Sequence, residues 1–190
     1  HAPDDPQLLF QLSTLDNNLG HILEANGDFE GATKDYRRML EAAQRLAKLG
    51  PDHDEWQNQL SLAHNNLAKM ALLRGDLAGA IAGYREDMTI KARLVERDPR
   101  NNGQRRLLLI TQATLGRTLA LTGQAGEGLP LLRKALEEAR RLHEMEPGST
   151  DYQGSIGLYA FQLARVEREQ GNAAAADQLV QESQDTLDAL

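Results

Sequence analysis

The chain has 190 residues, no cysteine and only 4% aromatic residues, which excludes a disulfide framework or a thiolate metal site and suits Leu/Ala helix packing better than a β-sandwich. Its net charge of −7 is spread evenly over both halves, so we expect no nucleic-acid binding by phosphate neutralisation. No apolar run approaches the roughly 18 residues of a membrane span, and no signal peptide is evident. We therefore expect a cytoplasmic protein without a membrane partner.

Apolar residues recur at helical spacing along eight segments that are too long for strands, so the sequence predicts an all-α chain. In chain order, the predicted helices cover about residues 6–26, 28–48, 54–74, 76–97, 101–122, 127–146, 150–170 and 172–189. A glycine ends the first helix of each pair, because glycine adopts positive φ at little cost. Asp28, Asp76 and Asn172 follow that glycine in three of the pairs and can cap the second helix.

The residues that break the helices repeat with a fixed period of 48. The glycines of this period are Gly27, Gly75, Gly123 and Gly171, and the prolines are Pro3, Pro51, Pro99 and Pro147. A shared period without slippage is typical of stacked repeats. We therefore expect one continuous array over residues 1–190, with repeats at about 4–50, 51–98, 99–146 and 147–190.

Apolar positions follow the same period. Large residues form the columns Leu12, Leu60, Leu108, Ile156 and Leu19, Leu67, Leu115, Leu163, which we expect to fill the space between hairpins. A column of small residues, namely Ala32, Ala80, Gly128 and Ala176, predicts close approach of the two helices of each hairpin. The last helix departs from the pattern with Asp177 and Gln184 at apolar positions, so we expect it to be a solvated cap.

These motifs resemble the tetratricopeptide repeat (TPR) family. In the second repeat the matching residues are Asn66, Leu67, Ala68, Gly75, Asp76, Leu77, Ala80, Ile81, Tyr84, Asp98 and Pro99. The period of 48 is longer than the usual repeat of about 34 residues and is similar to the long-helix, kinesin-light-chain type. The resemblance implies an α-solenoid of four antiparallel hairpins wound into a right-handed superhelix, whose concave groove binds an extended peptide or a partner helix.

The resemblance also implies which residues face that groove. They include Asn17, Asn65, Ala113 and Phe161, then the basic column His21, Lys69, Arg117 and Arg165, and the polar column Asn18, Asn66, Thr114 and Gln162. On an acidic chain, a local ladder of cations would select acidic ligands. The amides would pair with a peptide backbone. We therefore expect a protein–protein interaction module for an acidic segment.

Other interpretations stay open. The basic column also fits a solvated face that pairs with acidic residues of the neighbouring helix, and the asparagines also fit a role between helices. A self-association or regulatory module of a larger signalling protein is the alternative function, so a homo-oligomer is possible.

Catalytic chemistry has little support in the sequence. The string at 123–128, GQAGEG, lacks the lysine of a phosphate-binding P-loop and follows no predicted strand. The five histidines show no metal-binding spacing, and no constellation suggests an activated nucleophile. We therefore expect no enzyme activity, no cofactor and no metal.

Overall fold

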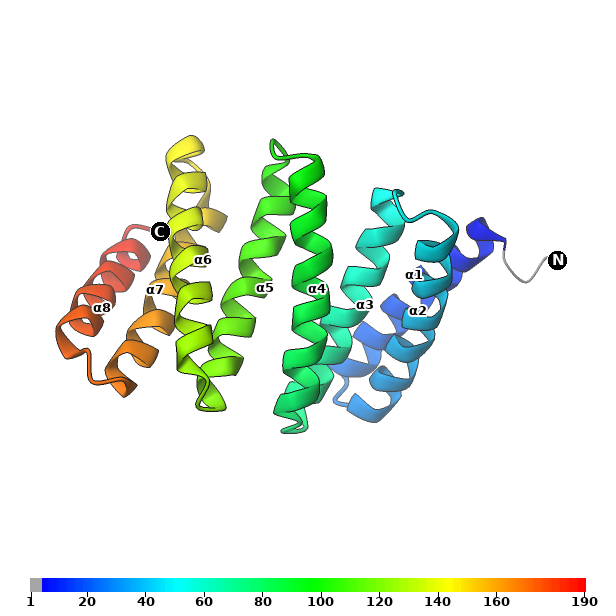
Figure 1. Cartoon of the computed structure of the whole chain (residues 1–190), viewed down its shortest axis with the longest axis horizontal. Coiled ribbons are helices and arrows are strands. Elements are labelled where there is room, and N and C mark those ends of the chain that lie inside the picture. Colours follow the sequence, from blue (N-terminus) through cyan, green and yellow to red (C-terminus); the bar gives the residue numbers. More distant parts are fainter. Residues whose placement is uncertain (1–4) are drawn as a thin grey trace. The chain divides into compact units, whose positions relative to one another are not determined.

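The computed structural model describes residues 5–190, so Pro3 lies outside the described residues. In that range the chain folds into eight α-helices, and the all-α prediction is confirmed (Figure 1). The helices are α1 (Pro6–Ala25), α2 (Phe29–Leu49), α3 (Asp54–Leu73), α4 (Leu77–Arg97), α5 (Asn102–Leu121), α6 (Ala125–Met145), α7 (Thr150–Glu169) and α8 (Ala173–Asp188). The predicted start of the sixth helix was two residues late, because α6 already begins at Ala125. None of these helices combines the length and apolar character that crossing a lipid bilayer requires.

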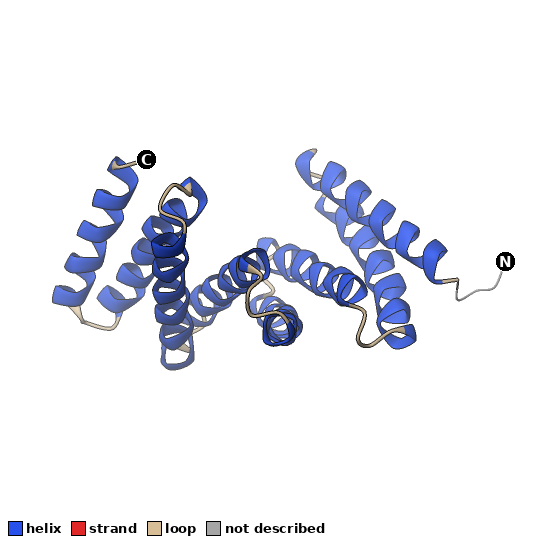
Figure 2. Cartoon of the chain, turned by 90° about the horizontal axis from the view of Figure 1, so that it is seen from above, coloured by secondary structure: helices blue, strands red, loops and turns tan. Residues whose placement is uncertain are grey.

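The helices form sequential antiparallel pairs, visible from above in Figure 2. The chain divides into two compact units that meet in sequence between Arg97 and Asp98. In the first unit, α1 pairs with α2 and α3 with α4, and α2 packs against α3. In the second unit, α5 pairs with α6 and α7 with α8, and α6 and α5 both contact α7. Each unit therefore holds two successive repeats.

The turn inside each pair confirms the role of the periodic glycines. Gly27, Gly75, Gly123 and Gly171 all have φ between +77° and +84°. The next residue donates its amide back to a carbonyl of the preceding helix, as Asp28 does to Leu23 at 2.9 Å, which is the Schellman way of ending a helix. Asp28 and Asp76 then cap the second helix as predicted. Asn172 does not, because its amide donates to Glu167 instead.

The hydrophobic core lies inside and between the pairs of each unit. In the second unit Leu132, Leu136 and Leu142 of α6 pack with Ile156 and Leu163 of α7 in one buried cluster. Of the predicted column residues in this unit, Leu115, Ile156 and Leu163 are buried and Leu108 is half-buried. In α1, by contrast, Leu12 and Leu19 are exposed. No helix among residues 5–190 packs over that face of α1.

The small-residue column brings the paired helices together as predicted. Ala32, Ala80 and Ala176 are fully buried. At the fourth position, a Cβ on Gly128 would overlap the carbonyl oxygen of Gly116 on the facing helix α5. The two backbones of that pair therefore touch at a point where no larger residue fits.

Candidate functional site: an arginine pocket between α5 and α7

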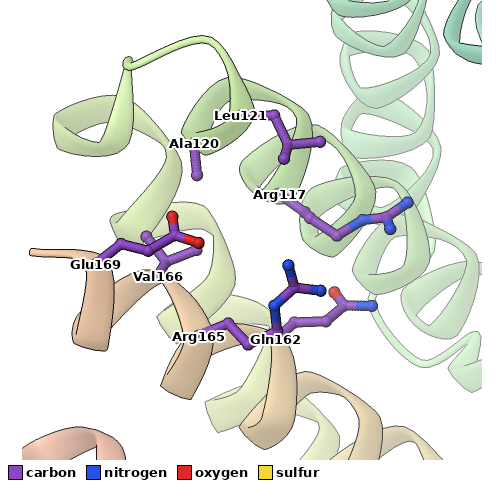
Figure 3. A pocket seen from close by; sticks show the side chains of 7 residues that line it. All are labelled: Arg117, Ala120, Leu121, Gln162, Arg165, Val166 and Glu169. Carbon is purple, nitrogen blue, oxygen red and sulfur yellow. The ribbon is translucent and has the colours of Figure 1, made fainter.

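A small pocket in the second unit collects three of the residues expected from the sequence. Its lining comes from one face of α5 and one face of α7 (Figure 3). The lining residues are Arg117, Ala120, Leu121, Gln162, Arg165, Val166 and Glu169. Arg117 and Arg165 stand one repeat apart in the sequence, so the 48-residue period places them at equivalent points of neighbouring hairpins. We call this site the arginine pocket.

The positive charges of the two guanidinium groups in the arginine pocket are not balanced by an ion pair within residues 5–190. Neither Arg117 nor Arg165 has an ion pair or hydrogen bond with any other side chain in residues 5–190. Arg117 Nε is also buried without a hydrogen-bond partner. A buried donor without a partner is unfavourable by about 1–3 kcal/mol, so an acceptor from outside the chain would relieve it.

The rest of the lining adds one acceptor, one acid and an apolar wall. Gln162 Oε1 is a second buried polar atom that lacks a partner in the described structure, and it would accept from an incoming N–H group. Figure 3 shows the Gln162 amide near the Arg165 guanidinium, with the Glu169 carboxylate at the other end of the pocket. Two arginines and one glutamate leave the lining with a positive charge.

The volume of the pocket limits what it can hold. It is about 50 Å³, whereas sites for drug-sized molecules measure about 300–1,000 Å³. A water molecule needs about 10–15 Å³ on the same measure. The arginine pocket can therefore take a group of a few atoms, such as one carboxylate, but not a whole small-molecule ligand.

In the first unit the basic column is neutralised internally. Lys69 of α3 forms an ion pair with Glu24 of α1, and His21 Nδ1 lies 3.7 Å from the same carboxylate. The Tyr36 hydroxyl donates to Glu24 at 3.0 Å and lies 2.9 Å from His21 Nδ1. The alternative of pairing with an acid of the neighbouring helix therefore applies to Lys69, whereas the acid beside His21 belongs to the same helix as His21.

The pKa values of this cluster follow from its burial and hydrogen bonds. Burial alone would raise the pKa of Glu24, but hydrogen bonds from Lys69 and Tyr36 together bring it below its ordinary value. For Tyr36, burial and the hydrogen bond to the Glu24 carboxylate both raise the pKa. Glu24 is thus held as a carboxylate that satisfies the charge of Lys69.

The asparagines expected in the groove hold the first unit together. Asn66 is only 3% exposed and donates to Asn17 Oδ1 at 2.9 Å, which links α3 to α1. The prediction that Asn66 presents its amide to a ligand is therefore wrong. Asn65 donates to Asp87 Oδ2 of α4 at 2.8 Å, and Asn18 lies exposed on α1.

Two other expected residues of the second unit stand apart from the arginine pocket. The Thr114 hydroxyl donates to the Ile110 carbonyl of its own helix at 2.8 Å. Phe161 is exposed and lines a separate apolar hollow between α7 and α8. Ala113, expected beside the groove, is buried in the core, so that expectation was wrong.

The sequence did not single out Ala120, Leu121, Val166 and Glu169 as lining residues. All four lie three, four or seven residues from an expected one on the same helix. Such spacing places side chains on one helix face, so it was the signal that could have found them. Among residues 5–190, no group of three His, Asp or Glu side chains is arranged to hold a metal ion.

Comparisons with known proteins agree with this geometry. Residues 17–55 match the family model described as tetratricopeptide repeat. The structure of BtubC (BKLC) from P. vanneervenii is similar at a TM-score of 0.53 and 18% identity, covering 97% of this chain and 83% of that one. A Podosopora anserina protein with nearly identical TPR-like repeats, assigned to the kinesin light chains, reaches a TM-score of 0.55 at 15% identity, with 93% and 96% covered. No curated protein matches the chain. At these identities the structural likeness shows the fold.

Proposed function

We propose that this chain of tetratricopeptide repeats, whose fold is of the kinesin-light-chain type, binds a segment of another protein and catalyses no reaction. Tetratricopeptide repeats are generally protein–protein interaction modules. On this proposal the arginine pocket receives an acidic side chain, or a terminal carboxylate, of the bound segment.

The observation that carries the proposal is the difference between the two units. Lys69 already has Glu24 as its acid, whereas Arg117 and Arg165 have no acidic partner in the described part of the chain. Arginine offers a planar set of donors that matches a carboxylate in bidentate fashion. Two such groups on neighbouring helices favour an acidic segment over a neutral one.

The geometry also favours a protein segment over a free small acid. The pocket holds only one carboxylate-sized group, so few contacts would retain a free metabolite. A segment can place one side chain in the pocket and lay its backbone along the adjacent face. A backbone N–H group of the segment could then donate to Gln162 Oε1, which has no hydrogen-bond partner in the described structure. Specificity would then come from the acid, and affinity from the remaining length of the segment.

The test is affinity capture with the wild-type chain and two charge-matched variants. Arg117→Glu with Arg165→Glu inverts the pocket. Arg37→Glu with Lys134→Glu makes the same change of net charge at exposed residues outside it. The helical circular-dichroism signal verifies that all three chains are folded.

We expect proteins captured by the wild type and by the control variant to be lost from the pocket variant. We also expect their binding segments to be acidic when mapped with overlapping peptides. Equal capture by all three chains would exclude the arginine pocket as the binding site.

A further inference from the structure

One apolar surface is exposed on the first helix. Leu8, Leu12, Leu15, Leu19 and Ile22 follow one another at intervals of three or four residues along α1, a spacing that places them on one face. Their side chains are between 38% and 57% exposed. We call this surface the α1 stripe.

The same columns are buried in α7. The residues 144 positions later, three periods of 48, are Tyr152, Ile156, Tyr159, Leu163 and Val166. None is more than 6% exposed, and all belong to the cluster formed with α5 and α6. The face that α7 uses to pack on the preceding hairpin is therefore the face that α1 leaves exposed.

A complementary surface lies at the other end of the chain. Between α7 and α8 is a hollow of about 420 Å³ with an almost entirely apolar lining, which includes Leu158, Phe161 and Leu187. These three side chains are between 48% and 51% exposed. We call this surface the C-terminal hollow.

The positions one period earlier show what covers such a surface. Six lining residues of the C-terminal hollow have counterparts at Leu109, Ala113, Leu132, Ala135, Leu136 and Ala139. All six are at most 2% exposed and share a cluster with α7. In the third repeat, the equivalent of the C-terminal hollow is thus filled by a first helix.

We propose that copies of this chain associate head to tail, with the α1 stripe of one copy covering the C-terminal hollow of the next. The contact repeats between molecules what α7 does with the third hairpin inside one molecule. The two contacting surfaces differ, so association continues from copy to copy or closes into a ring. The arginine pocket takes no part in it, and the proposal stands apart from the one on acidic segments.

The composition of the hollow makes this contact weaker than the internal one. Ser183 and Gln184 occupy the positions of Ala135 and Leu136, so these two positions are more polar than in the third repeat. The Ser183 hydroxyl is already buried and donates to the Gly157 carbonyl at 2.7 Å, so covering the hollow leaves that hydroxyl with its partner. We therefore expect reversible, concentration-dependent association.

The test measures the molar mass of the 190-residue chain over a range of concentrations. One variant, Leu15→Glu with Ile22→Glu, disables the stripe, and another, Phe161→Glu with Leu187→Glu, disables the hollow. Leu49→Glu with Leu73→Glu is the matched control, since these leucines are similarly exposed elsewhere. Circular dichroism verifies the fold of each.

We expect the mass of the wild type and of the control to rise with concentration, while each disabled variant stays monomeric. An equimolar mixture of the two disabled variants should form a one-to-one dimer, because each supplies the surface that the other lacks. A monomeric wild type at every concentration overturns the proposal. A hollow variant that still associates, or a mixture that stays monomeric, overturns it as well.

Discussion

Glu24 of α1 forms an ion pair with Lys69 of α3 and accepts a second hydrogen bond from the Tyr36 hydroxyl. The acid of the first repeat thereby neutralises the cation of the second. This pairing distinguishes Lys69 from Arg117 and Arg165, which occupy the same column of the repeat but form no ion pair within residues 5–190.

The pH dependence of stability should report this pairing. The pKa of Glu24 is lowered in the folded chain, so the unfolded chain takes up a proton first as the pH falls. The contribution of Glu24 is therefore present above the ordinary glutamate pKa of about 4.3 and is lost on acidification below it. We expect Glu24→Gln to flatten the fall in unfolding free energy between neutral and acidic pH, measured by urea denaturation.

Glu167 should cause part of the pH dependence of the unfolding free energy to remain in Glu24→Gln. Burial would raise its pKa, but hydrogen bonds from Asn172 and Arg133 lower it below its ordinary value. Glu144→Gln is the control, because Glu144 is exposed on α6, and it should keep the wild-type slope. An unchanged slope in Glu24→Gln would contradict the assignment.

The difference between paired and unpaired cations predicts different effects on ligand binding. We expect Arg165→Gln to weaken binding of an acidic peptide about tenfold or more, since hydrogen bonds to charged groups contribute about 1.5–3 kcal/mol. Lys69→Gln should change that affinity by less than about twofold, because its charge is compensated by Glu24. Calorimetric titration measures the affinity of both variants for the peptide. Equal losses of affinity would show that Lys69 takes part in binding as much as Arg165 does.

The second repeat contains a buried ion pair that the first lacks. Asp87 is fully buried, and Lys91 Nζ lies 2.8 Å from its Oδ2. Ser61 and Asn65 also donate to this carboxylate. Asp87→Ala removes the carboxylate to which Lys91, Ser61 and Asn65 all donate, so we expect a loss of about 3–5 kcal/mol in unfolding free energy.

The first repeat shows which residues can replace the buried pair. Its residues at these two positions are Met39 and Ala43, both fully buried. We expect Asp87→Met with Lys91→Ala to recover most of the stability, because an apolar replacement of a buried pair is often neutral. Chemical denaturation measures both variants. A double variant as unstable as Asp87→Ala would show that the charges, and not merely their pairing, are required.

The contact between Gly116 and Gly128 predicts a position-specific effect of one methyl group. A Cβ at Gly128 meets the backbone of α5, which has no side chain to move aside, so Gly128→Ala should destabilise by about 1–3 kcal/mol. Gly126→Ala, two residues earlier in α6, meets nothing within 4 Å and should stabilise by up to about 1 kcal/mol. Thermal melts of the two variants should shift in opposite directions. A shift of the same sign in both would refute the close approach.

The period made most of the fold predictable. Helix positions, turns and the small-residue contact all depend on residues in the same column, so repeats 48 apart predict one another. The continuous array over both units stays a prediction. The exposure of Leu12 and Leu19 depends on which helices lie beside α1 and not on the column.

The candidate site was less predictable, because side-chain partners fall between columns. Lys69 meets Glu24, which is 45 positions away, and Asn66 meets Asn17 at 49. The column of a residue therefore predicts its position on the helix. The partner of its side chain depends on residues of other columns. Arg117 and Arg165 stand in the same column as Lys69, but no acid among the described residues forms an ion pair with them as Glu24 does with Lys69.

The most direct measurement of the central proposal is the NMR signal of the two arginine side chains during a peptide titration. One peptide carries a single central glutamate, and its match carries glutamine there. We expect the Nε–Hε resonances of Arg117 and Arg165 to shift saturably with the glutamate peptide and to stay in place with the glutamine peptide. Resonances that stay in place with both peptides, or that move equally with both, would contradict carboxylate capture between α5 and α7.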